Sequence, residues 1–503
     1  MEHHRHQSTT IACCCFIWLL GLLQHASCYA TENRTNKLPE FQSELQRRSS
    51  SSAAAAAYNP ANKSSISMMH PKRQRGKVFY PIGYGADPSG SRDSADPILR
   101  AINDAFQLQN GHRRQLLPGI HDLGGIVIDL QGGNFLISKP IRFPPGTGNI
   151  VVQSGSLRAS DDFPANRHLI ELWSLSPRVT DKASYYEGIT FRDIIFDSSY
   201  RGGGIRVVDS VRIRIDHCFF LHFTTHGVLI IKGHETLISS CFLGQQPTVG
   251  EDQMEKHYSG TAIDIDSNDN VITDVVIFSA AVGIVLRSEA NTVTGVHCYN
   301  KADVYGGVGI LVKPEASLTR IGNCYMDFTG VVIEDPSQVR VTDGLFIGGA
   351  NVVLRSIKGS ISGLNIEGNM FRGYEGVGNS IVELDGNFTA VDQVVIERNN
   401  VKDMVLKSTA GRVTVAGHGS RWVADFSRVL IFPNRVSHFQ YAFHIRGAAE
   451  GGGGVGNNVT HWVSGVRRNA VVVESSAKVN AVVSVVVDQY NAVDETSYLL
   501  SES

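Results

Sequence analysis

The sequence predicts an all-β protein built as a right-handed parallel β-helix, and two observations carry this prediction. The first is a short apolar strand pattern, opened by a small residue, that recurs between Gly204 and Asp335. The opening residues lie at positions 204, 227, 262, 283, 309 and 330, which gives steps of 23, 35, 21, 26 and 21 residues. The second is a further apolar run after each of these strands. Such repeats indicate stacked turns that share one core, because a single turn cannot bury its own apolar face.

The N-terminal part of the chain has the features of a targeting segment followed by a linker. Arg5 precedes an apolar run over residues 11–23, and Cys28-Tyr29-Ala30 offers a small-x-small cleavage site. We therefore expect residues 1–30 to be a secretory signal peptide, with a retained signal anchor as the alternative. Residues 31–75 have no periodicity and carry serine and alanine runs, so they are predicted to be a disordered segment.

The β-helix itself is predicted over residues 76–435. Asp93 or Ser94 is expected to cap an amphipathic helix whose apolar positions include Ile98 and Ile102. A β-helix has an open end with unpaired strand edges, and this helix is well placed to cover that end. After about residue 435 the repeat weakens, and strands over 471–474 and 481–487 predict a small C-terminal β appendage over residues 436–503.

Composition limits the classes of partner. The formal net charge of the 503 residues is −2, so nothing in the charge balance indicates a nucleic acid or a membrane surface as partner. We expect a secreted monomer that needs no cofactor.

Cysteines and glycosylation sequons bear on the same compartment. Four cysteines lie outside the predicted signal peptide, at Cys218, Cys241, Cys298 and Cys324. The separations within the pairs 218/241 and 298/324 are 23 and 26 residues, about one turn each. Both pairs could therefore form disulfides, or all four thiols could pack unoxidised in the core. Sequons occur at four asparagines: Asn33, Asn62, Asn387 and Asn458.

Several motifs resemble a known family. They are the segments 196–205 (Phe-Asp-Ser-Ser-Tyr-Arg-Gly-Gly-Gly-Ile), 215–220 (Ile-Asp-His-Cys-Phe-Phe), 232–235 (Lys-Gly-His-Glu) and 260–270. Over roughly residues 78–435 the chain resembles the Quartet-type plant polygalacturonases of glycoside hydrolase family 28. The resemblance implies a pectin-lyase-like β-helix that is secreted to the plant cell wall and hydrolyses α-1,4-galacturonan. In this subgroup it also implies a role in the pectic wall around pollen mother cells.

The usual catalytic motifs of family 28 are absent at the matching places. Where that family carries Asn-Thr-Asp, Asp-Asp and Gly-His-Gly, this chain has Gly260-Thr261, Ala281-Val282 and Gly307-Val308. The tripeptide at 417–419 reads Gly-His-Gly, but it lies far downstream without its partners, and we interpret it as a chance match. The catalytic residues therefore cannot be transferred from the family by motif.

Strand alternation supplies an independent prediction of the site. Asp264 and Asp266 lie at i and i+2, so both are expected on the outer face, about 7 Å apart by strand rise. This separation suits inverting glycoside hydrolysis, in which one carboxyl group protonates the leaving oxygen and the other activates water. His226, one turn earlier, could orient a group or relay a proton. These three residues are the predicted catalytic set.

Cations near this pair predict binding of a polyanion. Arg287 and Lys313 follow on the next two turns, and Arg206 occupies the equivalent outward position on an earlier one. His257 belongs to a long loop that would wall the same face. We expect these four residues to bind a pectic polysaccharide, with no metal site. The structural alternative is a solvated face of stacked Asp–Arg and Lys–Glu pairs.

Two other functions remain open at this point. A Ca²⁺-dependent lyase would use Arg287 or Lys313 as the base and the two aspartates as Ca²⁺ ligands. A β-helix that binds the wall without turnover would account for the missing family motifs.

Overall fold

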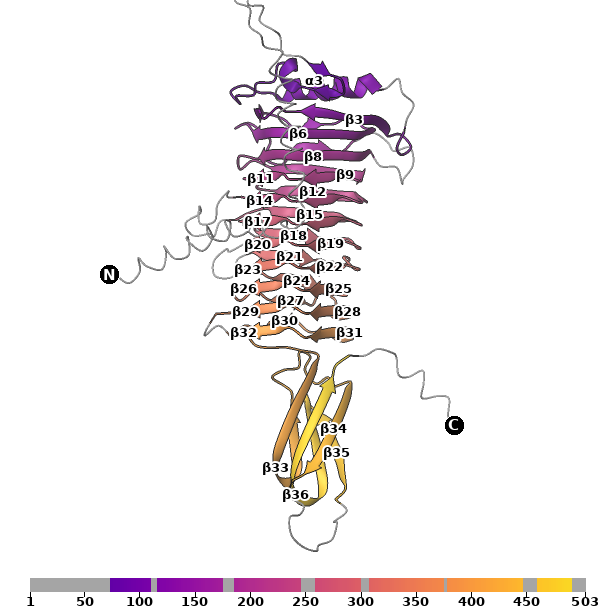
Figure 1. Cartoon of the computed structure of the whole chain (residues 1–503), viewed down its shortest axis with the longest axis vertical. Coiled ribbons are helices and arrows are strands. Elements are labelled where there is room, and N and C mark those ends of the chain that lie inside the picture. Colours follow the sequence, from indigo (N-terminus) through magenta and orange to yellow (C-terminus); the bar gives the residue numbers. More distant parts are fainter. Residues whose placement is uncertain are drawn as a thin grey trace, which may run out of the picture. The chain divides into compact units, whose positions relative to one another are not determined.

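The computed structural model describes residues 73–109, 115–174, 185–245, 258–299, 307–374, 378–446 and 459–490. Within these ranges strands β1 to β32 form one sheet system and β33 to β36 form a second, four-stranded sheet (Figure 1). The first is a right-handed parallel β-helix, which confirms the predicted fold class. The predicted signal peptide and the sequons at Asn33, Asn62 and Asn458 lie outside the described residues, whereas Asn387 is exposed. Among the described residues no helix is both long and apolar enough to cross a membrane.

The predicted N-terminal helix is α3, Ala95–Gln109, which lies across the first turns of the β-helix (Figure 1). The carbonyl oxygen of Ser94 accepts the first helical hydrogen bond from Ile98, and the carboxylate of Asp93 accepts one from the Ala95 amide at 3.1 Å. Ile98 and Ile102 are buried in the core that also holds the isoleucines of the first strands. The helix therefore continues the core beyond the first strands, at the N-terminal end of the β-helix, as its apolar stripe predicts.

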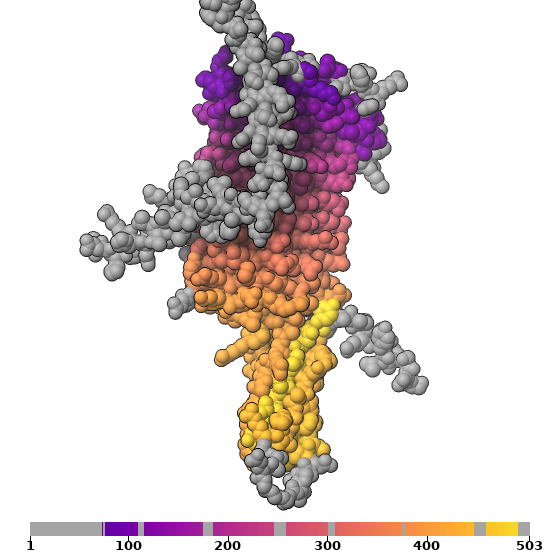
Figure 2. Space-filling view, viewed as in Figure 1, coloured from indigo at the N-terminus to yellow at the C-terminus, as the bar shows by residue number. Residues whose placement is uncertain are grey.

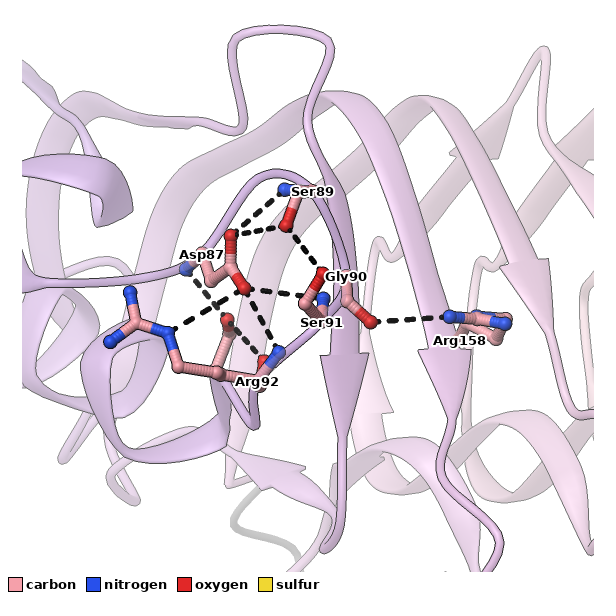
Figure 3. Close-up of polar contacts among 7 residues, drawn as sticks. Asp87, Ser89, Gly90, Ser91, Arg92 and Arg158 are labelled. Carbon is pink, nitrogen blue, oxygen red and sulfur yellow. Dashed lines mark hydrogen bonds and ion pairs between the residues drawn. The ribbon is translucent and has the colours of Figure 1, made fainter.

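The entry to the helix is a loop organised by one carboxylate (Figure 3). Asp87 accepts hydrogen bonds from the amide and hydroxyl groups of Ser89, at 3.1 and 2.7 Å, and from the amides of Ser91 and Arg92. The side-chain hydrogen bond from Ser89 is the main reason that the pKa of Asp87 is lowered. The Gly90 carbonyl accepts a hydrogen bond from Arg158, which ties the loop to a β-helix strand. This loop therefore has a structural role.

The turns of the β-helix stack into three ladders of parallel strands. The turns follow one another in sequence order, as the colours from indigo to orange show in Figure 2. The first turns also contain short elements before the ladders become regular: β1 Gln74–Arg75, β2 Val78–Phe79, η1 Pro81–Tyr84, β3 His121–Asp129, β4 Asn134–Ile137 and β6 Thr147–Ala159.

The first ladder contains β5 Ile141–Arg142, β7 His168–Leu172, β9 Gly203–Val211, β12 His226–His234, β15 Thr261–Asn268, β18 Val282–Leu286, β21 Val308–Val312, β24 Val331–Glu334, β27 Val352–Arg355 and β30 Val382–Asp385. The second contains β8 Tyr186–Asp197, β10 Arg214–Asp216, β13 Leu237–Ser239, β16 Val271–Thr273, β19 Thr292–Thr294, β22 Arg320–Gly322, β25 Ser337–Thr342, β28 Ser360–Glu367 and β31 Ala390–Glu397. The third contains β11 Phe219–Leu221, β14 Phe242–Gly244, β17 Val276–Phe278, β20 His297–Tyr299, β23 Tyr325–Asp327, β26 Leu345–Ile347, β29 Met370–Arg372 and β32 Asn400–Lys402.

The register of the first ladder follows the predicted alternation. Val228 lies opposite Ile205 on one side and Ile263 on the other, and Ile263 lies opposite Ile284. All four side chains are fully buried. The residues that alternate with them along each strand therefore face outward, which places the candidate site on the outer surface of this ladder.

The cysteines do not form the bridges that their spacing allowed. Each of the four described cysteines is a buried free thiol. Cys298 lies opposite Met326 and not opposite Cys324, so the second pair is out of register by two residues. Cys218 and Cys241 donate instead to backbone carbonyls within their own turns, at 3.3 and 3.1 Å. Burial raises the pKa of Cys218, Cys298 and Cys324, to about 11 for Cys324. The thiols fit the alternative of unoxidised core packing.

The second sheet is antiparallel and begins earlier than the predicted boundary at residue 435. Its strands are β33 Ala410–Asp425, β34 His438–Ile445, β35 His461–Arg467 and β36 Ala470–Asp488. All three other strands pair with β36, which spans both predicted C-terminal strands. An alternating run such as β33 suits parallel and antiparallel sheets equally, so the sequence did not reveal the change at Ala410. Gly417-His418-Gly419 lies within β33 and not in the β-helix.

Candidate active site

The structure places both predicted aspartates on the outer face of β15, because Ile263 and Ile265 on either side of Asp264 point into the core. Their environments differ. Asp264 is 4% exposed, whereas Asp266 is exposed to solvent. One oxygen of Asp266 accepts a hydrogen bond from the Ser288 hydroxyl at 3.1 Å. The two carboxylates therefore have different partners and different access to water.

Asp264 is held by Arg287 through two parallel hydrogen bonds. The Nε and Nη2 atoms of Arg287 lie 2.8 Å from Oδ1 and Oδ2 of Asp264. This bidentate geometry is the strongest arrangement for an arginine and a carboxylate. The hydrogen bond to Asp264 is also the main reason that the pKa of Arg287 is raised. The contact fixes the orientation of Asp264 and uses the guanidinium that was predicted to bind substrate.

His226 lies beside Asp264 and stacks on a second imidazole that the sequence prediction missed. Its Nε2 atom is 3.8 Å from Oδ2 of Asp264. The rings of His226 and His168 have centroids 5.7 Å apart and an interplanar angle of 19°. Gly203 lies on the strand between them, and a Cβ there would be 2.6 Å from the His168 ring. The stack therefore requires glycine at position 203.

Burial disfavours the charged form of both imidazoles. The pKa of His168 is lowered to about 3, mainly by desolvation and also by the neighbouring His226. The pKa of His226 is also lowered, mainly by desolvation, although Asp264 opposes the shift. A neutral imidazole can accept a proton as well as donate one. His226 is therefore suited to move a proton next to Asp264.

Lys313 belongs to a row of ion pairs further along the ladder. Its Nζ atom lies 2.5 Å from Glu334, whose other oxygen is 3.8 Å from Arg355. Arg355 in turn lies 2.8 Å from Asp385. Lys313 therefore already has a carboxylate partner, as the structural alternative of stacked charge pairs expected. His257 lies outside the described residues.

On the other side of the two histidines, a buried carboxylate organises several cations. Glu171 is fully buried and accepts hydrogen bonds from Arg142, Arg167 and the indole of Trp173, at 3.1, 2.7 and 2.8 Å. Burial by itself would raise the pKa of Glu171, but the hydrogen bonds from Arg167 and Trp173 outweigh it and the pKa is lowered. Arg206 lies opposite Glu171 in the register.

Metal ligands are not grouped in the described ranges, where no three His, Cys, Asp or Glu side chains come together as a metal site. At β15 the bidentate contact with Arg287 engages both oxygens of Asp264. Both oxygens of Asp264 therefore already have a partner within the chain.

The fold and this face define a right-handed β-helix protein that carries a pair of carboxylates on its outer surface. No model of a known protein family matches the chain. The chain is 47% identical over 420 residues to Polygalacturonase QRT3 of Arabidopsis thaliana, across 82% of this chain and 84% of that protein. The chain therefore belongs to the family of this plant polygalacturonase.

Two solved structures are similar to the chain at low identity. One is the endo-xylogalacturonan hydrolase of Aspergillus tubingensis, with 12% identity, a TM-score of 0.48, and coverage of 66% of this chain and 95% of that chain. The other is the tailspike gp61 of Pseudomonas phage phi297, with 10% identity, a TM-score of 0.48, and coverage of 83% of this chain and 100% of that chain.

Proposed function

We propose that the chain is a secreted polygalacturonase-type glycoside hydrolase that cleaves α-1,4-galacturonan in plant cell walls, including the pectic wall around pollen mother cells. Membership of the family of Polygalacturonase QRT3 supports the substrate class. The observation that carries the proposal is the pairing of Asp264 and Asp266 on one outer face with His226 beside them.

The two carboxylates would divide the reaction between them. Residues at i and i+2 on a strand lie about 7 Å apart, within the roughly 6.5–9.5 Å range of inverting enzymes. Asp266 is exposed and would donate its proton to the glycosidic oxygen as the bond to the anomeric carbon breaks. Asp264, oriented by Arg287, would draw the proton from the water that attacks the same carbon. Its side chain is only 5% exposed and that of His226 is 28% exposed, so His226 would carry the proton onward.

The alternative functions have weaker support. A lyase would need an unprotonated Arg287 or Lys313, but each is paired with a carboxylate that favours its charged form. Binding without turnover draws support from one observation: the bidentate contact that uses both oxygens of Asp264. The same contact is compatible with catalysis, because each carboxylate oxygen can accept a second hydrogen bond.

The proposal is tested with the secreted protein on polygalacturonate, with and without Ca²⁺, by following reducing ends and the ultraviolet absorbance of unsaturated ends. We expect reducing ends alone, and a loss of about 10²-fold or more in Asp264→Asn and in Asp266→Asn. Asp269→Asn changes an exposed carboxyl just beyond the same strand and should leave the rate unchanged. Unsaturated ends that require Ca²⁺ would identify a lyase, and undiminished hydrolysis in both variants would remove the carboxylate pair from the mechanism.

A further inference from the structure

Arg206 differs from the other arginines in or next to the strands of the first ladder. Among the described residues, it has no carboxylate within ion-pair distance. The others are paired: Arg142 and Arg167 with Glu171, Arg212 with Glu187, Arg287 with Asp264, and Arg355 with Glu334 and Asp385. An outward-facing guanidinium without an internal partner keeps its planar set of donors for a ligand.

Trp173 holds this guanidinium in place. The central carbon of the Arg206 guanidinium lies 5.7 Å from the centroid of the Trp173 ring, and that of Arg142 lies 4.6 Å from it. The ring is itself fixed, because its indole nitrogen donates to the buried Glu171 at 2.8 Å. The cation–π contact therefore orients Arg206 without using its hydrogen-bond donors.

Unpartnered nitrogen atoms gather around Arg206. Its own Nε is buried and has no hydrogen-bond partner among the described residues, and the same holds for Nδ1 of His226 and for both ring nitrogens of His168. His168 is 5% exposed. The charge of Arg206 contributes to lowering the pKa of both imidazoles, so the three side chains act on one another. Buried donors without acceptors are costly, and sites that bind a ligand are one reason that they persist.

We infer that Arg206 binds the free carboxylate of a uronate residue of the polysaccharide, next to the carboxylates that act on the glycosidic bond. Arg206 and Asp264 lie in one register row with Leu229 between them, a separation of about 10 Å at the usual strand spacing. Trp173 is a positioning residue that keeps the guanidinium directed at this subsite. The inference rests on the proposed function for the class of polysaccharide.

Specificity for unesterified uronate follows from this assignment. A carboxylate offers the guanidinium two charged acceptors, whereas a methyl ester removes the charge and one of the acceptors. A site built to satisfy polar groups discriminates strongly against a ligand that leaves them unpaired. Discrimination between the acid and the ester should therefore depend on Arg206.

Binding of short oligogalacturonates tests the inference, using the full chain with Asp266→Asn as background so that turnover is slowed about 10²-fold or more during the measurement. The probes are an unesterified oligomer and the same oligomer fully methyl-esterified. Arg206→Gln should weaken binding of the unesterified oligomer about tenfold or more and leave binding of the ester unchanged. Arg206→Lys keeps the charge but loses the planar donor geometry of the guanidinium, and should give an intermediate loss of affinity for the unesterified oligomer.

Two further variants separate recognition from folding. Arg340→Gln changes an exposed outward arginine of the second ladder and should leave both affinities as they were. Trp173→Leu should reduce the ratio of acid to ester affinity, whereas Trp173→Phe retains a ring for the guanidinium and should preserve most of it. A merely structural role for Trp173 would lower both affinities equally.

Equal losses for the two oligomers, no loss in Arg206→Gln, or no binding of either oligomer would each overturn the inference. Failure of the proposed function is distinguishable from these outcomes. A chain that hydrolyses nothing, yet binds the acid oligomer in an Arg206-dependent way, would contradict the hydrolase proposal and support the subsite. A chain that hydrolyses polygalacturonate, and whose Arg206→Gln variant keeps the same preference for the acid oligomer, would support the hydrolase proposal and contradict the subsite.

Discussion

The stacked pair His168 and His226 shows how one small residue creates the environment of two titratable groups. Gly203 lies on β9 between their two strands and has no side chain, so the ring centroids of the two imidazoles approach to 5.7 Å across it. His168 is surrounded by His226, Glu171, Arg206 and Arg167, of which only Glu171 favours the charged form. The neutral state of His168 is therefore part of the folded structure.

This neutral state predicts a pH dependence of stability. The pKa of His168 is about 3 in the folded chain and 6.5 ordinarily. Below pH 6.5 the imidazole of His168 binds a proton in the unfolded chain but not in the folded chain. The contribution of His168 to the stability of the folded chain is therefore fully present above pH 6.5 and is lost as pH falls toward 3. The contribution to the slope is about 1.4 kcal/mol per pH unit. His168→Phe keeps a ring in the stack and should reduce the pH dependence of the urea unfolding midpoint between pH 4 and 6.5. An unchanged slope would show that His168 does not carry the effect.

At this scale, the sequence predicted which side chains face outward, and the structural alternative of stacked Asp–Arg and Lys–Glu pairs described how some of them pair. Asp264 and Asp266 share a face because the strand period is two, and this requires no tertiary information. The engagement of Asp264 by Arg287 depends on side-chain reach across neighbouring strands. His168 precedes His226 by 226 − 168 = 58 residues, and only the register of β7, β9 and β12 brings them together. Gly203, one turn before His226, was the signal that could have indicated the stack.

Single elements are stabilised by buried side-chain amides that link successive turns. The carboxamide oxygen of Asn270 accepts the backbone N–H of Thr236 at 2.9 Å, and its nitrogen donates to Ser267 and to Asn291, at 2.8 and 2.9 Å. Asn291 repeats the pattern by accepting the backbone N–H of Asn270 at 3.0 Å. These bonds satisfy backbone groups at the corner between the first and second ladders, where the sheet pattern is interrupted.

Removal of one amide from this row should destabilise the corner. Asn270→Ala leaves the buried N–H of Thr236 without its acceptor, and we expect a loss of about 2–4 kcal/mol in the free energy of unfolding. The measurement is urea unfolding at neutral pH. Asn365→Ala, which shortens a half-buried residue on the outer face of β28, is the matched control and should change stability by less than about 0.5 kcal/mol. Equal losses in the two variants would contradict a specific role for the row.

The presence of the strands was more predictable than the register in which they pair. The repeat of apolar strands located two strands in each turn of the core, because each inward position must be apolar in every turn, whereas the third ladder was not predicted. A bridge between Cys298 and Cys324 requires one turn of 26 residues, whereas the partner of Cys298 is Met326, 326 − 298 = 28 residues away. Turns of unequal length shift the register, and residue counting alone cannot detect this. The start of β33 escaped prediction for the related reason that alternation does not reveal strand direction.

At the scale of the whole β-helix, each turn contacts only its neighbours, so stability should spread from turn to turn and the ends should matter most. The N-terminal end is covered by α3, whose Ile98, Ile102 and Ala105 join the core. The first ladder, with the candidate site on β7 to β18, begins only a few turns below this helix. The cap therefore protects the strands that position the site.

Truncation of one core side chain of the cap should loosen the β-helix from that end. Ile102 is 1% exposed, so Ile102→Ala removes buried methyl groups and should cost about 2–5 kcal/mol locally. Leu108 is 54% exposed on the same helix, and Leu108→Ala is the control. Amide hydrogen exchange should then rise in peptides over β3 and β6 and stay unchanged over β27 to β31, because the distant turns keep their own neighbours. A uniform rise along the ladders would instead show that the β-helix unfolds as a single cooperative unit, in which the cap stabilises the distant turns as strongly as the near ones.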